Sequence, residues 1–76
     1  MSNEVEYKVS EKYIVEQYRN SLLDYYTAVN DGEKWSARSS MARLEELAML
    51  QYGFAFADEL RDLALEPIKD ILVLES

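Results

Sequence analysis

The sequence predicts an all-α fold, a small helical hairpin or three-helix domain with short extended or irregular ends. Three observations predict it. Apolar residues recur at spacings of three and four along most of the chain, which is the period of one helix face. The chain holds only two glycines and one proline, so few positions break a helix. Its composition is 49 % hydrophobic, which is too apolar for a disordered chain.

The length of 76 residues predicts one domain. Such a chain buries only roughly 60–65 % of its unfolded surface, and without cysteine no disulfide supplements its core. Small folds of this kind often rely on a second chain, so we expect a homodimer, a dimeric helical bundle, in preference to a monomer. We divide the chain into an N-terminal arm or short strand, residues 1–9, and a single helical domain, residues 10–76.

The first helix is expected to begin at Glu11. Ser10 before it can act as the cap, because its hydroxyl can accept a hydrogen bond from a first-turn amide. Five apolar residues share one face of this helix: Ile14, Tyr18, Leu22, Tyr25 and Val29. The NDG triplet at residues 30–32 is expected to end the helix, with Gly32 in a left-handed backbone conformation.

The second helical pattern follows the triplet, and either Ser36 or Asp31 can cap its start. One face of it holds Ala37, Met41, Leu44 and Ala48. Gly53 then leaves two interpretations. One long helix runs to about Glu66 and tolerates Gly53 at a cost of about 1 kcal/mol relative to Ala. Alternatively the helix ends at Gly53 and a third begins near Phe54, which we favour because the apolar face shifts there.

The third apolar face is formed by Met49, Tyr52, Phe56, Leu60 and Leu63. Pro67 ends or kinks whatever helix precedes it, because proline lacks the backbone amide and crowds the previous turn. Residues 67–76 are therefore either a last short helix or a terminal strand.

The segment LAMLQYGFAFA, residues 47–57, carries no charge. Successive helical residues step by about 100°, so its apolar side chains point in almost every direction and should be hidden from water. Three explanations are open. The segment is central in a monomer core, it packs against itself in a symmetric dimer, or it is a docking surface for another protein.

The absence of histidine and cysteine bounds the chemistry. It removes serine–histidine and cysteine–histidine catalysis and the usual zinc ligands, and no glycine-rich phosphate loop is present. We therefore expect no enzyme, no cofactor and no metal site.

The net charge of −7 is concentrated in residues 44–76, which hold eight of the 15 acids and two of the eight bases. This balance should repel nucleic acid and anionic membranes and attract a basic protein surface. We see no signal peptide, and no apolar run approaches the roughly 20 residues of a membrane helix. The expected location is cytoplasmic.

Four acids recur at intervals of four: Asp58, Asp62, Glu66 and Asp70. On a continuous helix they would form a line with about 6 Å between neighbours, on the order of phosphate spacing along a nucleic-acid strand. One hypothesis is that this line mimics nucleic acid in a basic groove. The simpler interpretation is a solvated face, partly neutralised by Arg61 and Lys69 and interrupted by Pro67.

Basic residues gather in a second region, formed by Lys34, Trp35, Arg38 and Arg43. We expect Arg38 and Arg43 to pair with acids of the same or a neighbouring subunit, and Trp35 to pack over the hairpin end. Four tyrosine hydroxyls should line the rim of the apolar face: those of Tyr13, Tyr18, Tyr25 and Tyr26.

The sequence thus predicts a small acidic, non-enzymatic protein that binds a protein partner stoichiometrically, as an inhibitor that masks a nucleic-acid-binding surface in the manner of virus-borne counter-defence proteins. The alternative is a structural subunit that assembles with itself as a homodimer. The candidate apolar contacts are Leu50, Tyr52, Phe54 and Phe56. The candidate acidic contacts are Asp58, Glu59, Asp62 and Glu66.

Overall fold

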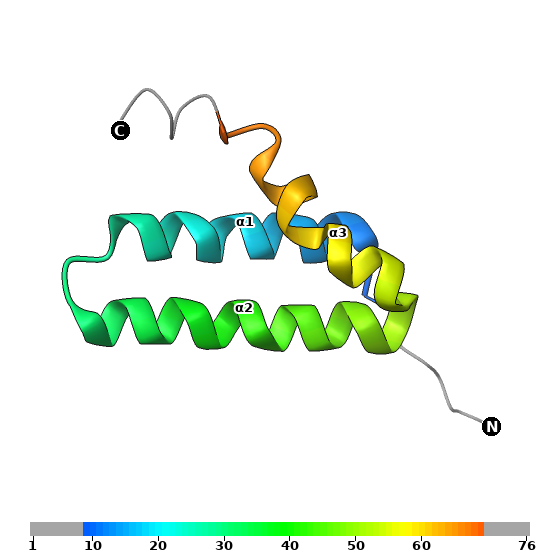
Figure 1. The fold of residues 1–76 in the computed structure, drawn as a ribbon, viewed down its shortest axis with the longest axis horizontal. Helices are drawn as coiled ribbons and strands as arrows, with labels where there is room; N and C mark the ends of the chain where they lie inside the picture. The colour runs from blue at the N-terminus through cyan, green and yellow to red at the C-terminus, as the bar shows by residue number, and fades with distance from the viewer. Residues whose placement is uncertain (1–8, 70–76) are drawn as a thin grey trace.

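The computed structural model describes residues 9–69, which form three α-helices: α1 (Glu11–Thr27), α2 (Asp31–Tyr52) and α3 (Phe54–Leu65). Helices α1 and α2 form an antiparallel hairpin, and α3 folds back across the open end of that hairpin (Figure 1). Each helix contacts the other two. The all-α, three-helix prediction is confirmed. The predictions made for residues 1–8 and 70–76 lie outside the described residues.

Helix α1 begins where the sequence predicts. The Ser10 hydroxyl accepts a hydrogen bond from the Tyr13 amide at 3.0 Å, so Ser10 is the cap. The predicted apolar face is buried at Ile14 and Leu22 but not at Val29, which is 83 % exposed. The reason is that the helix ends at Thr27, before Val29 can continue the face.

The start of α2 differs from the prediction, because Asn30 is the cap rather than Ser36 or Asp31. Its side-chain oxygen accepts a hydrogen bond from the Glu33 amide at 2.8 Å. The Glu33 carboxylate reaches back to accept one from the Val29 amide at 3.1 Å, so the two residues satisfy amides reciprocally. Gly32 therefore lies inside the helix and not in a left-handed turn.

Gly53 separates α2 from α3, which confirms the predicted break. Its φ of 97° and ψ of 173° lie in a region that is essentially restricted to glycine. Its amide donates to the Met49 carbonyl at 2.9 Å, and its carbonyl accepts from the Ala57 amide at 3.2 Å. Gly53 therefore ends α2 and begins α3, so the chain turns sharply without a loop.

The core lies where the three helices meet. Its buried apolar residues are Ile14, Tyr18, Leu22, Ala37, Met41, Ala48, Leu60, Ala64 and Ile68. Alanine at the contacts allows the helix backbones to approach one another. Leu63, predicted to lie on the buried face of α3, is instead 42 % exposed, and its neighbour Ala64 is fully buried. After α3 the Ile68 amide donates to the Leu65 carbonyl at 3.0 Å, and the Ile68 side chain is buried.

Polar side chains tie the elements together across this core. The Arg19 Nε on α1 donates to the Ala64 carbonyl of α3 at 2.8 Å. The Val9 amide donates to the Gln51 Oε1 at 2.8 Å, and the Val9 carbonyl accepts from the Tyr52 hydroxyl at 2.6 Å. These contacts hold Val9, two residues before the start of α1, beside the last turn of α2.

Candidate functional site

The four apolar candidates do not share one environment. Leu50 is 71 % exposed and Phe54 is 72 % exposed, whereas Tyr52 and Phe56 are half-buried. The rings of Tyr52 and Phe56 meet edge to face, with centroids 5.3 Å apart. Tyr52 and Phe56 thus contribute to internal packing, and we refer to Leu50 and Phe54, on either side of Gly53, as the corner pair.

The uncharged segment is consequently not hidden in the single chain. The burial expected of a central core segment holds for Ala48, which is fully buried, and is wrong for Leu50 and Phe54. The break at Gly53 explains the difference, because it divides the segment between two helices. Each of these helices keeps an outer side that no other described element covers.

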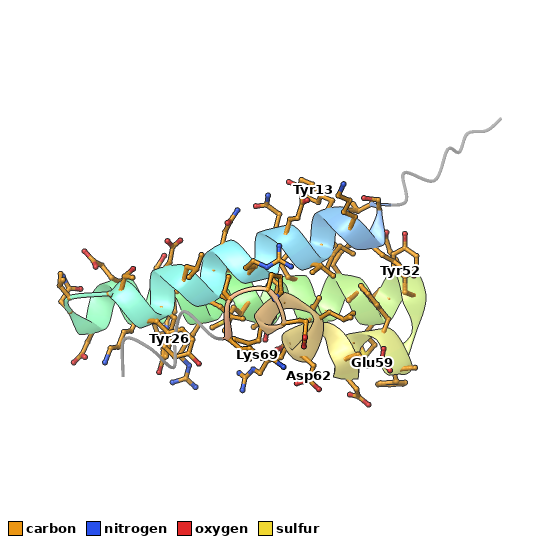
Figure 2. All side chains as sticks on the ribbon, turned by 90° about the horizontal axis from the view of Figure 1, so that it is seen from above. Tyr13, Tyr26, Tyr52, Glu59, Asp62 and Lys69 are labelled. Atoms are coloured by element: carbon orange, nitrogen blue, oxygen red, sulfur yellow. The ribbon has the colours of Figure 1, made fainter. Side chains whose placement is uncertain are left out.

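The four acidic candidates are all exposed, and they lie along α3 and its C-terminal cap. Glu66 keeps helical backbone angles, and its amide donates to the Asp62 carbonyl at 3.0 Å. Asp58, Asp62 and Glu66 therefore lie one helical turn apart, about 6 Å along the axis. Glu59 and Asp62 are labelled in Figure 2. Asp70, the predicted end of the line, lies outside the described residues. We call Asp58, Glu59, Asp62 and Glu66 the acidic face.

Only one end of the acidic face has a cationic partner among residues 9–69. The Lys69 Nζ lies 3.3 Å from the Glu66 Oε1, and both side chains are exposed, so the pair is weakly stabilising. Arg61, the other expected partner, is engaged elsewhere. Its guanidinium lies beside the Tyr18 hydroxyl and near the Glu45 carboxylate, and this contact raises the pKa of Arg61.

Tyr18 is the centre of a network of polar side chains that includes Glu45 and Arg61. It is fully buried, and its hydroxyl donates to the Glu45 Oε2 at 2.5 Å. Burial is the main cause that raises the pKa of Tyr18, and the hydrogen bond to Glu45 adds to it. The network joins α1, α2 and α3. The prediction that Tyr18 lies at a wet rim is therefore wrong, whereas Tyr13 and Tyr26 are exposed.

Two expectations about the basic region are not met within residues 9–69, whereas pairing with acids of a neighbouring subunit stays a prediction. Neither Arg38 nor Arg43 forms an ion pair there, since the pair between Lys69 and Glu66 is the only one in that range. Trp35 is 71 % exposed and does not pack over the hairpin end. The early end of α1 and the cap at Asn30 place Trp35 on the outer side of α2's first turns.

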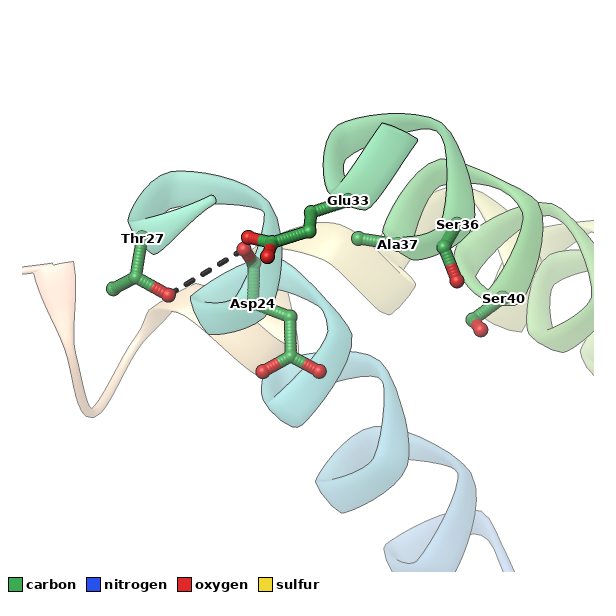
Figure 3. Close-up of a pocket in the computed structure, with 6 residues that line it drawn as sticks. All are labelled: Asp24, Thr27, Glu33, Ser36, Ala37 and Ser40. Carbon is green, nitrogen blue, oxygen red and sulfur yellow. Dashed lines mark hydrogen bonds between the residues drawn. The ribbon is translucent and has the colours of Figure 1, made fainter. Parts of the chain in front are cut away.

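Clefts lie between the helices. One of 300 Å³ at the hairpin end is lined by Asp24, Thr27, Glu33, Ser36, Ala37 and Ser40 (Figure 3). There the Thr27 hydroxyl donates to backbone carbonyls of its own helix, at 2.8 Å to Leu23. No group of three or more metal-binding side chains occurs in the described part of the chain. This cleft is lined mostly by polar side chains.

Another cleft, of 450 Å³, separates α1 from α3 and has Val15, Phe56 and Leu63 among its lining residues. A further one, of 330 Å³, is lined by Leu22, Tyr25, Tyr26, Arg38, Met41 and Arg61. Sequence reasoning missed this last cleft because its two arginines are distant in the chain and lie on different helices. One sequence feature could have pointed to this cleft. The chain has only eight basic residues against 15 acids, so each arginine was a candidate for a specific contact.

No helix among residues 9–69 has both the length and the apolar character needed to cross a membrane. Comparison with protein-family models, curated proteins and solved structures finds no match to this chain.

Proposed function

We propose that this chain binds a basic surface on a protein partner, stoichiometrically and without chemistry, and masks a surface that otherwise binds nucleic acid. The observation that carries the proposal is the joint exposure of the corner pair and the acidic face within residues 50–66. Two large apolar side chains and four carboxylates are thus presented by one short stretch of chain.

The carboxylates of the acidic face are arranged to attract a basic surface. Like charges one helical turn apart destabilise an isolated helix by a few tenths of a kcal/mol per pair. A basic surface opposite the acidic face would offset this repulsion by attracting all four carboxylates. The surroundings of Arg61 support the proposal, because Arg61 lies near the Tyr18 hydroxyl and forms no ion pair with the acidic face within residues 9–69. Complementary charge of this kind speeds association and selects the partner.

The corner pair adds an apolar anchor beside the charges. Fully burying a Leu or Phe side chain stabilises a contact by roughly 1.5–3 kcal/mol. Leu50 and Phe54 are the two described residues of the candidate site with that much area left to bury. Interfaces typically combine such an anchor with a polar rim, and the acidic face would form the rim here.

A charge-reversal experiment tests the proposal. The chain is immobilised and used to capture proteins from an extract of its source cells, with and without added duplex DNA. The test variant is Asp58→Lys, Asp62→Lys, Glu66→Lys. The matched control reverses three exposed acids elsewhere, Glu16→Lys, Asp24→Lys, Glu46→Lys.

We expect the unaltered chain and the control to capture the same basic protein, and DNA to release it. The test variant should keep its helix content and lose the capture. Equal capture by the test variant and the control, or capture that excess DNA does not reduce, would contradict the proposal.

Self-assembly is the second candidate function, and the exposure of the corner pair favours it as well. Sedimentation of the purified chain at micromolar concentration separates the two candidates. A dimer that Leu50→Asp, Phe54→Asp converts to a folded monomer would support self-assembly through the corner. A monomer would leave the corner pair available for another protein.

A further inference from the structure

We propose that the cleft between Arg38 and Arg61 is a binding site for a small organic oxyanion, an aryl or short-chain carboxylate or phosphate monoester. We call it the arginine cleft, lined by Leu22, Tyr25, Tyr26, Arg38, Met41 and Arg61. This inference does not rest on the acidic face or on a protein partner.

The composition of the lining is the first argument. The chain has a net charge of −7 and only eight basic residues, yet the described residues that line this cleft include two arginines and no acid. Each of the three helices contributes at least one lining residue, with Tyr25 on α1, Arg38 on α2 and Arg61 on α3. Guanidinium groups bind carboxylates and phosphates with paired hydrogen bonds. The tertiary fold therefore assembles an anion-binding group of residues that is not contiguous in sequence.

The two arginines differ in their contacts within the chain, and either arrangement leaves the guanidinium able to bind an anion. Arg61 lies near the Tyr18 hydroxyl and Glu45, and it is exposed. Arg38 is exposed and forms no ion pair within residues 9–69. Glu45 offsets one positive charge near the cleft, so Arg38 supplies the charge that remains unmatched.

The uncharged lining residues of the cleft indicate what the part of the ligand outside its anionic group should be. Leu22 and Met41 are both buried core residues and are the aliphatic members of the lining. The rings of Tyr25 and Tyr26 stand nearly perpendicular, 77° apart, with centroids separated by 5.7 Å. A volume of 330 Å³ lies at the lower end of small-molecule sites, which span roughly 300–1,000 Å³. A ligand with one anionic group and a compact apolar body matches this combination.

The experiment is an NMR titration of the full chain with phenyl phosphate and with benzoate. Inorganic phosphate and benzyl alcohol serve as probes that lack the apolar body or the charge. Because the chain as a whole repels anions, binding must come from local contacts. We expect phenyl phosphate or benzoate to bind with a Kd of about 1 mM or tighter. They should shift the signals of Tyr25, Tyr26, Arg38 and Arg61.

Arg38→Gln should weaken this binding by about tenfold or more, the loss expected of a charge-assisted contact. Arg43→Gln, on α2 but outside the cleft, should leave it unchanged. The proposal is overturned if neither aryl probe shifts these signals, or if inorganic phosphate or benzyl alcohol binds as tightly. Equal weakening by the two variants also overturns it. The signal map of the unaltered chain decides the question if Arg38→Gln does not fold.

Discussion

At the scale of single residues, Tyr18 combines two roles that usually fall to different side chains. Its ring is part of the apolar core, and its hydroxyl donates to Glu45 across the α1–α2 contact. A buried hydroxyl without a partner would destabilise the fold, so Glu45 and Arg61 make this burial possible. A helical face containing Tyr predicts the burial of the ring. It does not reveal the partners of the hydroxyl, which come from two other helices.

Because of the Tyr18 network, the free energy of unfolding should vary with pH in the alkaline range. In the unfolded chain Tyr18 loses its proton near the ordinary tyrosine pKa of 10.0, whereas burial raises that pKa in the folded chain. The folded state then binds more protons, so this contribution to stability is complete below pH 10 and is lost as pH rises through the folded pKa. Tyr18→Phe should flatten the decline in urea midpoint above about pH 10. The control Tyr13→Phe, at an exposed position, should keep the decline. An unchanged decline in Tyr18→Phe would contradict the assignment.

Leu60 tests the core at the same scale. It is fully buried, and a Leu→Ala change in a core typically destabilises by about 2–5 kcal/mol. For a chain of this size the whole stability is roughly 4–11 kcal/mol. Urea denaturation followed by circular dichroism should show a large loss for Leu60→Ala. Leu50→Ala, at an exposed position, should lie within about 0.5 kcal/mol of the unaltered chain. Similar losses at the two positions would show that the burial pattern is wrong.

At the scale of elements, the single residue between α2 and α3 controls the direction of the chain. Gly53 has a φ of 97°, and a Cβ built on it would meet nothing within 4 Å. The restriction is thus the backbone conformation itself and not contact with neighbours. Gly53→Ala should destabilise by about 1–3 kcal/mol. It should also favour a straight junction of α2 and α3, measured by the loss of near-ultraviolet circular dichroism. A stability equal to that of the unaltered chain would contradict this role.

The start of α2 gives a second test among the elements, because its cap is Asn30 and not one of the two predicted residues. Asn30→Ala removes the side chain that accepts from the Glu33 amide and should destabilise by about 1 kcal/mol. Ser36→Ala, at a predicted cap that lies inside the helix, should have little effect or stabilise slightly. Thermal melts of the two variants check this, and the reverse order would place the helix start at Ser36.

Comparison of the three helices with their predictions shows which parts of the fold are determined by the local sequence. The cap at Ser10 and the break at Gly53 follow from the chemistry of one residue, and both predictions are confirmed. The start of α2 was missed because Asn30 was assigned to the turn that ends α1, although Asn is as capable a cap as the predicted Asp31 and Ser36. Asn30 is favoured as the cap because the Glu33 carboxylate also accepts a hydrogen bond from the Val29 amide. That amide is available because α1 has already ended at Thr27.

At the scale of the whole molecule, the candidate site follows from where three helices leave surface uncovered. The exposure of the acidic face was predictable, since charged residues on a helix rarely lie in a core. The exposure of Leu50 and Phe54 was not, because period and composition do not say which apolar side chains the other helices reach. The arginine cleft was hidden from sequence for the same reason, since it exists only after α3 folds back.

The central claim is that residues 50–66 form the contact surface for a protein partner. Hydrogen–deuterium exchange on the chain, free and bound to its captured partner, tests it most directly. We expect slower exchange in the bound state along α3 and at the end of α2, with little change in α1 and near Trp35. Protection confined to α1 or to the hairpin end, with exchange in residues 50–66 unaltered, would contradict it.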